Sequence, residues 1–251
     1  MAAAVSAAVA GLAWLARGLT GMGAAAACVV GTLVLFGSGW SGGAVLAAFF
    51  VSGTLVSRIA RPPALLDPKG HRRDARQVLA NGGVAAGLAL FGRQDPALAL
   101  WLVTGALAAA SADTWATSIG SRSRTVPRRV VGWAPVPAGT SGGVTPAGSA
   151  GALAGAAIVA LTGAVAAGSP PLFPAATLVG FLGMAIDSAL GATLQARYRC
   201  AACGVPSEWP VHRCGAATVH EGGIAWLDND GVNLAATAAA AALALAAWAC
   251  C

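Results

Sequence analysis

Four aspartates stand within or beside long apolar segments. Asp113 lies near the end of one segment in SADTWAT, and Asp187 lies inside another in AIDSALG. Asp228 and Asp230 directly precede a third in WLDNDGVN. A carboxylate at mid-bilayer costs about 2.5–3.5 kcal/mol on insertion scales, so it usually faces a wet interior and has a partner. We expect all four to share a pocket that binds Mg²⁺ bridging phosphates, or else each to pair structurally with an arginine or, for the last two, to cap a helix.

A basic segment, PKGHRRDARQVLANGG, offers the opposite charge. It carries Lys69, Arg72, Arg73 and Arg76, which run into the start of a predicted helix. In that helix Gln77 and Asn81 are four residues apart on one face. Ammonium and guanidinium groups make charge-assisted hydrogen bonds to phosphate oxygens. The segment therefore predicts phosphate binding, and the alternative is a topology signal that contacts anionic lipid.

A glycine-rich stretch at 137–155, PAGTSGGVTPAGSAGALAG, precedes and enters another apolar segment. Its backbone N–H groups could face an anion at a helix N-terminus, with Thr140 and Ser141 beside Gly142 and Gly143. The stretch lacks the Gly-Lys-Ser/Thr ending of a P-loop. Glycine-rich turns are also common in membrane bundles, so the pattern indicates an anion site only together with the charged segments.

Cysteine spacing predicts a separate metal site. Cys200 and Cys203 are followed by His212 and Cys214, which together offer the four tetrahedral ligands of a small structural zinc knuckle at 200–214. The alternative is a set of reduced thiols in a cytoplasmic loop.

Composition sets the class of protein. Of 251 residues, 57% are apolar and only 10% are charged, whereas soluble domains carry about 25% charged residues. Mean hydropathy is +0.72. The apolar residues are mostly Ala and Gly, and small residues let membrane helices approach closely. We therefore expect an all-α, polytopic transmembrane bundle that forms a single integral membrane domain over residues 1–251.

The apolar segments suggest seven or eight crossings, near 2–16, 22–37, 42–60, 78–92, 95–118, 142–166, 172–195 and 231–250. With eight, every basic residue except Arg93 falls in connections on one side. The positive-inside rule then places the long loops 58–77, 119–141 and 196–230 in the cytoplasm and both termini opposite. Topology thus accounts for the net charge of +6, and no nucleic-acid partner is expected.

Five motifs, in chain order, resemble one membrane family. They are RQVLANGG at 76–83, SADTWAT at 111–117, GTSGGV at 139–144, the stretch from Asp187-Ser188 to Gln195, and WLDNDGVN at 226–233. The family includes the plant phytyl-phosphate kinases of tocopherol synthesis and bacterial and archaeal relatives of unknown function. One position departs from the family pattern, because Ser118 stands where an acidic residue is expected.

The resemblance implies an enzyme that transfers a phosphoryl group from CTP or another nucleoside triphosphate to an isoprenoid monophosphate, giving the prenyl diphosphate. Mg²⁺ would bind the four aspartates, and membrane lipids would surround the protein. The expected phosphate-binding residues are Lys69, Arg72, Arg73, Gln77, Asn81, Thr140, Ser141, Gly142, Gly143, Ser188, Gln195, Asn229 and Asn233. The alternatives are a lipid-phosphate transporter or flippase, and a cytidylyltransferase that forms a CDP-lipid.

Overall fold

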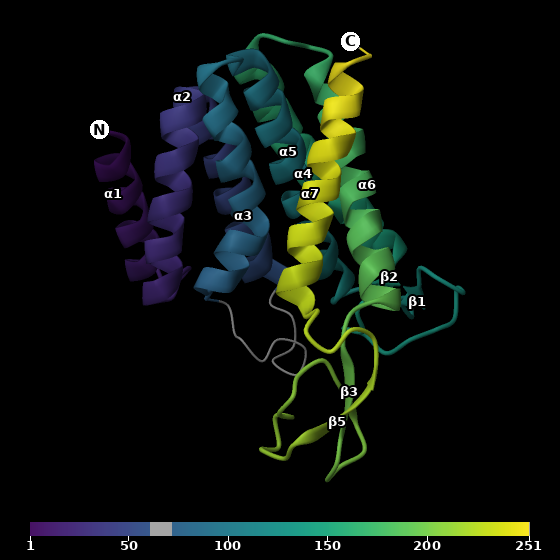
Figure 1. Ribbon diagram of the computed structural model, residues 1–251. Coiled ribbons are helices and arrows are strands. Elements are labelled where there is room, and N and C mark those ends of the chain that lie inside the picture. Colours follow the sequence, from purple (N-terminus) through teal and green to yellow (C-terminus); the bar gives the residue numbers. More distant parts are fainter. Residues whose placement is uncertain (61–71, 251) are drawn as a thin grey trace.

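The computed structural model of the protein describes residues 1–60 and 72–250 and consists mainly of helices (Figure 1). Five helices are long and apolar enough to cross a membrane, by length and composition. This confirms the predicted helical membrane bundle, whereas the count of seven or eight crossings stays a prediction. In chain order the helices are α1 (Ala2–Leu15), α2 (Gly21–Ala60), α3 (Ala75–Ala89), the 3-10 helix η1 (Leu90–Arg93), α4 (Pro96–Gly120), α5 (Pro146–Ala167), α6 (Leu172–Thr193) and α7 (Asn229–Trp248).

Helix α2 turns back on itself at Gly39. The backbone there has φ 61° and ψ −155°, a conformation that glycine adopts without a Cβ clash. Gly23 and Gly53 both lie against Arg73: a Cβ built on Gly23 would be 2.2 Å from its carbonyl oxygen, and one on Gly53 2.8 Å from Nη2. A straight helix would separate these glycines by about 45 Å. The two halves are therefore antiparallel, as the predicted segments 22–37 and 42–60 require.

The long connections gather at one end of the bundle, which we call the loop-side end, and both termini lie toward the other (Figure 1). This matches the predicted grouping of the loops, although the side of the membrane that they face stays a prediction. Two small antiparallel sheets, which the sequence did not indicate, lie in these connections. One pairs β1 (Arg128–Arg129) with β2 (Gly143–Val144), and the other has the order β4-β3-β5, formed by β3 (Arg197–Cys200), β4 (Pro206–Ser207) and β5 (Thr218–Gly222).

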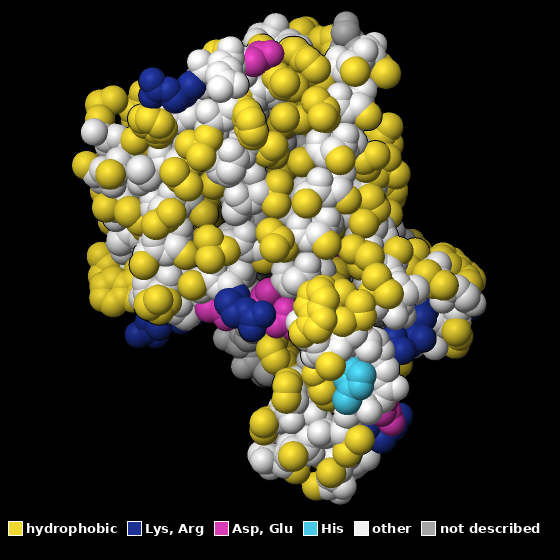
Figure 2. Space-filling model, in the orientation of Figure 1, with side chains coloured by type: hydrophobic (Ala, Val, Ile, Leu, Met, Phe, Trp, Pro, Cys, Tyr) yellow, Lys and Arg dark blue, Asp and Glu magenta, His cyan; other side chains and the backbone are white. Residues whose placement is uncertain are grey.

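Helix α4 is the centre of the bundle. It packs against α2, α3, α5, α6 and α7, and every residue from Ala99 to Ala112 is buried. Small residues bring its neighbours close: Gly155 of α5 lies against Ser111, whose hydroxyl donates to the Gly155 carbonyl at 2.8 Å, and Gly180 of α6 lies against Ala108. The outer face is largely hydrophobic, and most charged side chains in view lie at the lower edge of the helices and below (Figure 2).

Enlarging Gly180 should test this packing. A Cβ there would lie 2.9 Å from the backbone carbon of Ala108 and 2.8 Å from Cβ of Ala156. Gly180→Ala should therefore lower the free energy of unfolding by about 1–3 kcal/mol, the usual cost of overpacking, measured as a lower thermal midpoint in detergent. Gly87→Ala is the control, because nothing lies within 4 Å of its Cβ position, and it should gain up to about 1 kcal/mol of helix propensity. Equal midpoints for the two variants would contradict the close contact.

Candidate active site

A cavity of about 370 Å³ opens at the loop-side end, between the helices and the 139–145 segment. We call it the loop-side cavity. It brings together nearly all of the residues that the sequence singles out, although they are spread over more than 150 positions of the chain. Those that line it are Arg73, Gln77, Asn81, Asp113, Thr140, Ser141, Gly142, Gly143, Asp187, Ser188, Gln195, Asp228, Asn229, Asp230 and Asn233.

Of the predicted phosphate-binding residues that the structure describes, Arg72 is the one that does not line the cavity. Arg72 points elsewhere, because its Nε donates to the Leu19 carbonyl at 3.1 Å and so ties the start of α3 to the connection after α1. Lys69 lies outside the described residues.

Asp113 and Asp187 form the acidic part of the cavity. They come from α4 and α6, each about 10 Å along its helix from the loop-side end at 1.5 Å per residue. Both also line a smaller pocket, together with Asn81 and Asn233. Within residues 1–60 and 72–250, neither makes an ion pair, and the buried Oδ2 of Asp187 has no hydrogen-bond partner. The alternative of one arginine for each carboxylate therefore does not describe this pair.

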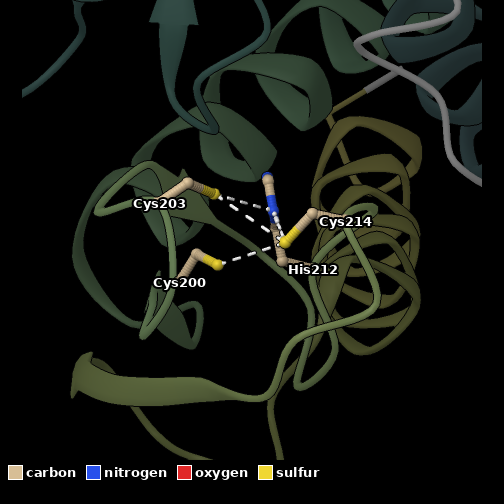
Figure 3. Close-up of side chains that lie close together, drawn as sticks. All are labelled: Cys200, Cys203, His212 and Cys214. Carbon is tan, nitrogen blue, oxygen red and sulfur yellow. Dashed lines mark hydrogen bonds between the residues drawn. The ribbon is translucent and has the colours of Figure 1, made fainter.

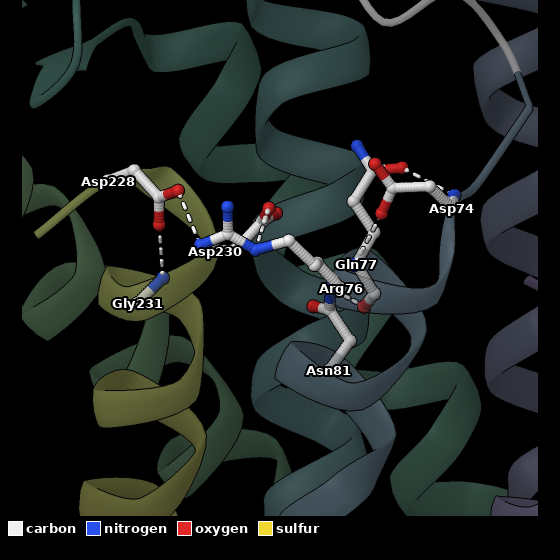
Figure 4. A network of polar contacts seen from close by, with 7 residues as sticks. All are labelled: Asp74, Arg76, Gln77, Asn81, Asp228, Asp230 and Gly231. Carbon is white, nitrogen blue, oxygen red and sulfur yellow. Dashed lines mark hydrogen bonds and ion pairs between the residues drawn. The ribbon is translucent and has the colours of Figure 1, made fainter. Parts of the chain in front are cut away.

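Asp228 and Asp230 are placed differently, because both contact Arg76 of α3 (Figure 4). The Asp228 Oδ2 lies 2.7 Å from Arg76 Nη2, and the Asp230 Oδ2 lies 3.8 Å from Arg76 Nε. Asp228 also caps α7, since its Oδ1 accepts a hydrogen bond from the Gly231 N–H at 3.0 Å. For Asp228, the ion-pair and helix-cap alternatives both hold. The pair therefore joins the first turns of α3 and α7 at the edge of the cavity.

This separation bears on the expected Mg²⁺ site. In the described part of the chain, the one group of three or more acidic, cysteine or histidine side chains close enough to hold a metal is the Cys/His cluster considered below. The four aspartates do not form such a group. Mg²⁺ in phosphate-handling sites is usually bound by one or two carboxylates together with water and substrate phosphates. Asp113 and Asp187 both line the cavity, and the Asp187 Oδ2 has no hydrogen-bond partner, so the two residues fit this smaller ligand set.

Arg73 supplies a fixed positive charge. Its guanidinium lies over the rings of Phe49 and Phe50, 5.1 and 5.6 Å from their centres. Its backbone is held as well, because its N–H donates to the Gly18 carbonyl and its carbonyl accepts from the Thr20 N–H, each at 3.0 Å. Burial lowers the pKa of Arg73 to about 10, which leaves the side chain charged at neutral pH. The cavity therefore contains a cation whose position is set by packing.

Three helices also begin at the cavity. Helices α3, α5 and α7 have the N-caps Asp74, Thr145 and Asp228, and each cap side chain accepts a hydrogen bond from a backbone N–H of its first turn. The N-terminus of a helix carries about half a positive charge. It also has free N–H groups, so it favours anions. Carboxylates already cap α3 and α7, so the positive groups that make one side of the cavity suited to an anion are Arg73 and the N-terminus of α5, whose cap Thr145 is neutral.

Polar side chains on α3 are partly committed to holding that helix. The Gln77 Oε1 accepts from the Asp74 N–H at 3.1 Å, which completes a capping box. The Asn81 Nδ2 donates to the Gln77 carbonyl at 2.9 Å (Figure 4). Both side chains nevertheless line the cavity, so the predicted shared face of this helix is confirmed.

The glycine-rich segment reaches the cavity by close approach to α6. Gly142 has φ 74°, and a Cβ on it would lie 2.6 Å from the Ser188 carbonyl, so a larger residue would push the segment away. The next N–H, that of Ser141, donates to Glu208 Oε1 at 3.0 Å, and Glu208 Oε2 accepts from the Gln195 Nε2 at 3.0 Å. A carboxylate thus already occupies donors that the sequence assigns to phosphate.

Sequence reasoning assigned no role to Glu208 or to the paired contacts of Arg76. Glu208 is 67 residues from Ser141, and no motif or spacing connects them. Arg76 belongs to the basic segment and opens a matched motif, but neither feature indicates that it contacts two aspartates. At the position where the family pattern calls for an acid, Ser118 is buried and its hydroxyl lies 3.1 Å from that of Ser57. It adds a hydroxyl to the cavity wall in place of a carboxylate.

The predicted zinc ligands converge outside this cavity. The donor atoms of Cys200, Cys203, His212 and Cys214 all lie within 4.8 Å of one another (Figure 3).

Fold and cavity define an integral membrane protein whose apolar helices hold a cavity with acidic and basic side chains at one end. The model of the integral membrane protein family DUF92 matches residues 4–241, and the chain belongs to that family. This confirms the membership that the five motifs predict.

Relatives come from plants, archaea and cyanobacteria. Protein PGR of Arabidopsis thaliana is 31% identical over 239 residues, which cover 82% of each chain. An uncharacterized membrane protein of Methanocaldococcus jannaschii is 29% identical over 71% of this chain and 76% of its own. One of Synechocystis is 29% identical over 90% and 81%. No solved structure matches the chain significantly.

Replacing a half-buried carboxylate that has no ion pair within the described residues should stabilise the protein, because an amide carries no charge to desolvate. Asp187→Asn should raise the free energy of unfolding by roughly 0.5–2 kcal/mol, the range typical of stabilising changes at strained sites. The measurement is thermal unfolding in metal-free detergent. Asp95→Asn is the matched control: Asp95 caps α4 at the opposite end, where its Oδ1 accepts from the Leu98 N–H, and Asn caps about equally well. A midpoint for Asp187→Asn below that of wild type would show that the Asp187 carboxylate does not destabilise the folded protein.

Proposed function

We propose that this protein is a membrane-embedded prenyl-monophosphate kinase, which transfers the γ-phosphoryl group of CTP or another nucleoside triphosphate to an isoprenoid monophosphate such as phytyl phosphate. One observation carries the proposal: the half-buried carboxylates of Asp113 and Asp187 share a cavity with the half-buried Arg73 and the N-terminus of α5. Carboxylates alone would repel phosphate, and positive groups alone would bind any anion. Both together suit a polyphosphate that arrives with Mg²⁺.

The reaction requires little covalent chemistry from the protein. A phosphate oxygen of the prenyl monophosphate attacks the γ-phosphorus of the nucleotide, the bond from that phosphorus to the β-bridging oxygen breaks, and the nucleoside diphosphate leaves. The acceptor is already an anion, so no strong base is needed. Positioning and charge neutralisation supply most of the rate in such transfers.

The chain's own groups divide this work. Asp113 and Asp187 would hold Mg²⁺, which neutralises charge as the two phosphates come together. Arg73 would bind phosphate oxygens opposite them, and the N-terminus of α5 would orient a second phosphate. The prenyl chain would lie along the apolar helices. The resemblance of the five sequence motifs to the kinase family supports this assignment. The names of the relatives assign no activity.

Replacing the carboxylate of either Asp113 or Asp187 should strongly reduce the rate of phosphoryl transfer. Purified protein with CTP, Mg²⁺ and phytyl phosphate should yield phytyl diphosphate and CDP, measured by mass spectrometry. Asp113→Asn and Asp187→Asn should each reduce the rate by roughly 100-fold or more, as is usual when a group that stabilises transition-state charge is lost. Asp95→Asn should keep the wild-type rate. Full activity in both cavity variants would end the assignment.

Two adjacent arginines provide an internal comparison. Arg73 lines the cavity, whereas Arg72 donates to the Leu19 carbonyl outside it. Arg73→Met should reduce kcat/KM for the nucleotide by roughly 100-fold. Arg72→Met should stay within about threefold per folded molecule, although the lost hydrogen bond costs about 1 kcal/mol of stability. The reverse order of the two effects would show that the donor phosphates bind elsewhere.

The products separate the competing functions. A CDP-lipid with released pyrophosphate would indicate a cytidylyltransferase. Movement of a labelled prenyl phosphate across vesicles without nucleotide would indicate a transporter or flippase. A panel of prenyl monophosphates with CTP, ATP and GTP, in which both products are identified, therefore tests the reaction class and the donor base together.

A further inference from the structure

The connection between α6 and α7 carries a four-residue cluster that the proposed kinase reaction does not use. Cys200 ends β3, Cys203 follows in the next turn, and His212 and Cys214 lie in the segment before β5. In Figure 3 the three sulfur atoms and the His212 ring point toward one another from two separate turns. The Cys200–Cys203 pair and the His212–Cys214 pair thus approach a common centre, although Cys203 and His212 are nine positions apart in the chain.

The distances between these atoms match the edges of a metal-centred tetrahedron. With Zn–S near 2.3 Å and Zn–N near 2.0–2.1 Å, tetrahedral geometry places ligand sulfurs about 3.8 Å apart and sulfur and nitrogen roughly 3.5 Å apart. Here Cys214 Sγ lies 3.5 Å from Cys200 Sγ and 3.8 Å from Cys203 Sγ. The His212 Nδ1 lies 3.3 Å from Cys203 Sγ and 3.1 Å from Cys214 Sγ. A disulfide would instead require about 2.0 Å.

The surrounding structure needs a cross-link. The strands of this sheet are two to five residues long, and neither hydrophobic core cluster of the described chain includes a residue from 197–222. Units of this size rarely bury enough apolar surface to fold alone, and a structural metal is a common solution. Hydrophobic packing therefore does not account for the fixed shape of the segment.

The two ligand pairs enclose the residues that reach the loop-side cavity. Glu208 and Trp209 both line it, and Glu208 accepts hydrogen bonds from the Ser141 N–H and the Gln195 side chain. Whatever fixes residues 200–214 therefore also fixes Glu208 on the cavity.

We propose that Cys200, Cys203, His212 and Cys214 bind one Zn²⁺, which holds residues 200–214 in shape and keeps Glu208 against the loop-side cavity. Four protein ligands leave no open coordination position, so the ion is structural. Thiolate and imidazole ligands in tetrahedral geometry favour zinc over magnesium or calcium. The inference stands apart from the proposed kinase reaction, because it concerns metal binding and the local fold.

Metal analysis of the full-length protein in detergent tests the proposal. Protein loaded with Zn²⁺ and then passed over a desalting column should retain about one zinc per chain, measured by plasma mass spectrometry. Cys203→Ser and Cys214→Ser should each lose most of it, whereas Cys28→Ser, in α2 and far along the chain from the cluster, should keep it. The wild-type result decides the matter even if a ligand variant fails to fold. Wild-type protein without tightly held zinc, with iron instead, or with a disulfide among these cysteines would overturn it.

Proteolysis tests the effect on the segment. Arg213 is an exposed trypsin site between two ligands. Zinc-loaded protein should resist cleavage after Arg213, and removal of the metal with a chelator should speed cleavage at least tenfold. Cleavage at the exposed Arg17, at the other end of the chain, should not change. Equal rates at Arg213 with and without zinc would show that the ion does not hold the segment.

Discussion

The carboxylates of Asp113 and Asp187 must be kept solvated inside a bundle whose other interior residues are mostly alanine, glycine and valine. A buried ion without compensation costs several kcal/mol. Much of the loop-side end can be understood as compensation: a cavity of about 370 Å³, the guanidinium of Arg73 and the N-terminus of α5. These features would serve no purpose in an ordinary apolar bundle.

Close packing holds this arrangement in place. The two carboxylates come from different helices, so their separation depends on how α4 and α6 meet. Gly180 and Gly183 of α6 lie directly against Ala108 and Ala109 of α4, which fixes the approach with little freedom to slide. In lipid, such contacts replace the hydrophobic drive that would press helices together in water. The small residues between α4 and α6 therefore also set the positions of Asp113 and Asp187 relative to each other.

The sequence was most informative where one local property decided the outcome. Apolar length predicted the helices, including the break between segments 22–37 and 42–60, and charge near apolar segments led to Asp113 and Asp187. It was least informative where partners are distant in the chain. The contact of Glu208 with Ser141, the sharing of Arg76 by two aspartates and the turn of Arg72 toward Leu19 all depend on tertiary packing. No periodicity records such contacts.

The placement of Glu208 has a thermodynamic consequence. Its carboxylate accepts hydrogen bonds from the Ser141 N–H and the Gln195 amide, so an anion that takes these two donors must first displace it. The measured affinity of such an anion then equals its intrinsic affinity reduced by the free energy of displacement, and each occupant weakens the other by the same factor. The Glu208 carboxylate therefore competes with such an anion and raises the anion concentration needed for half-occupancy of the two donors.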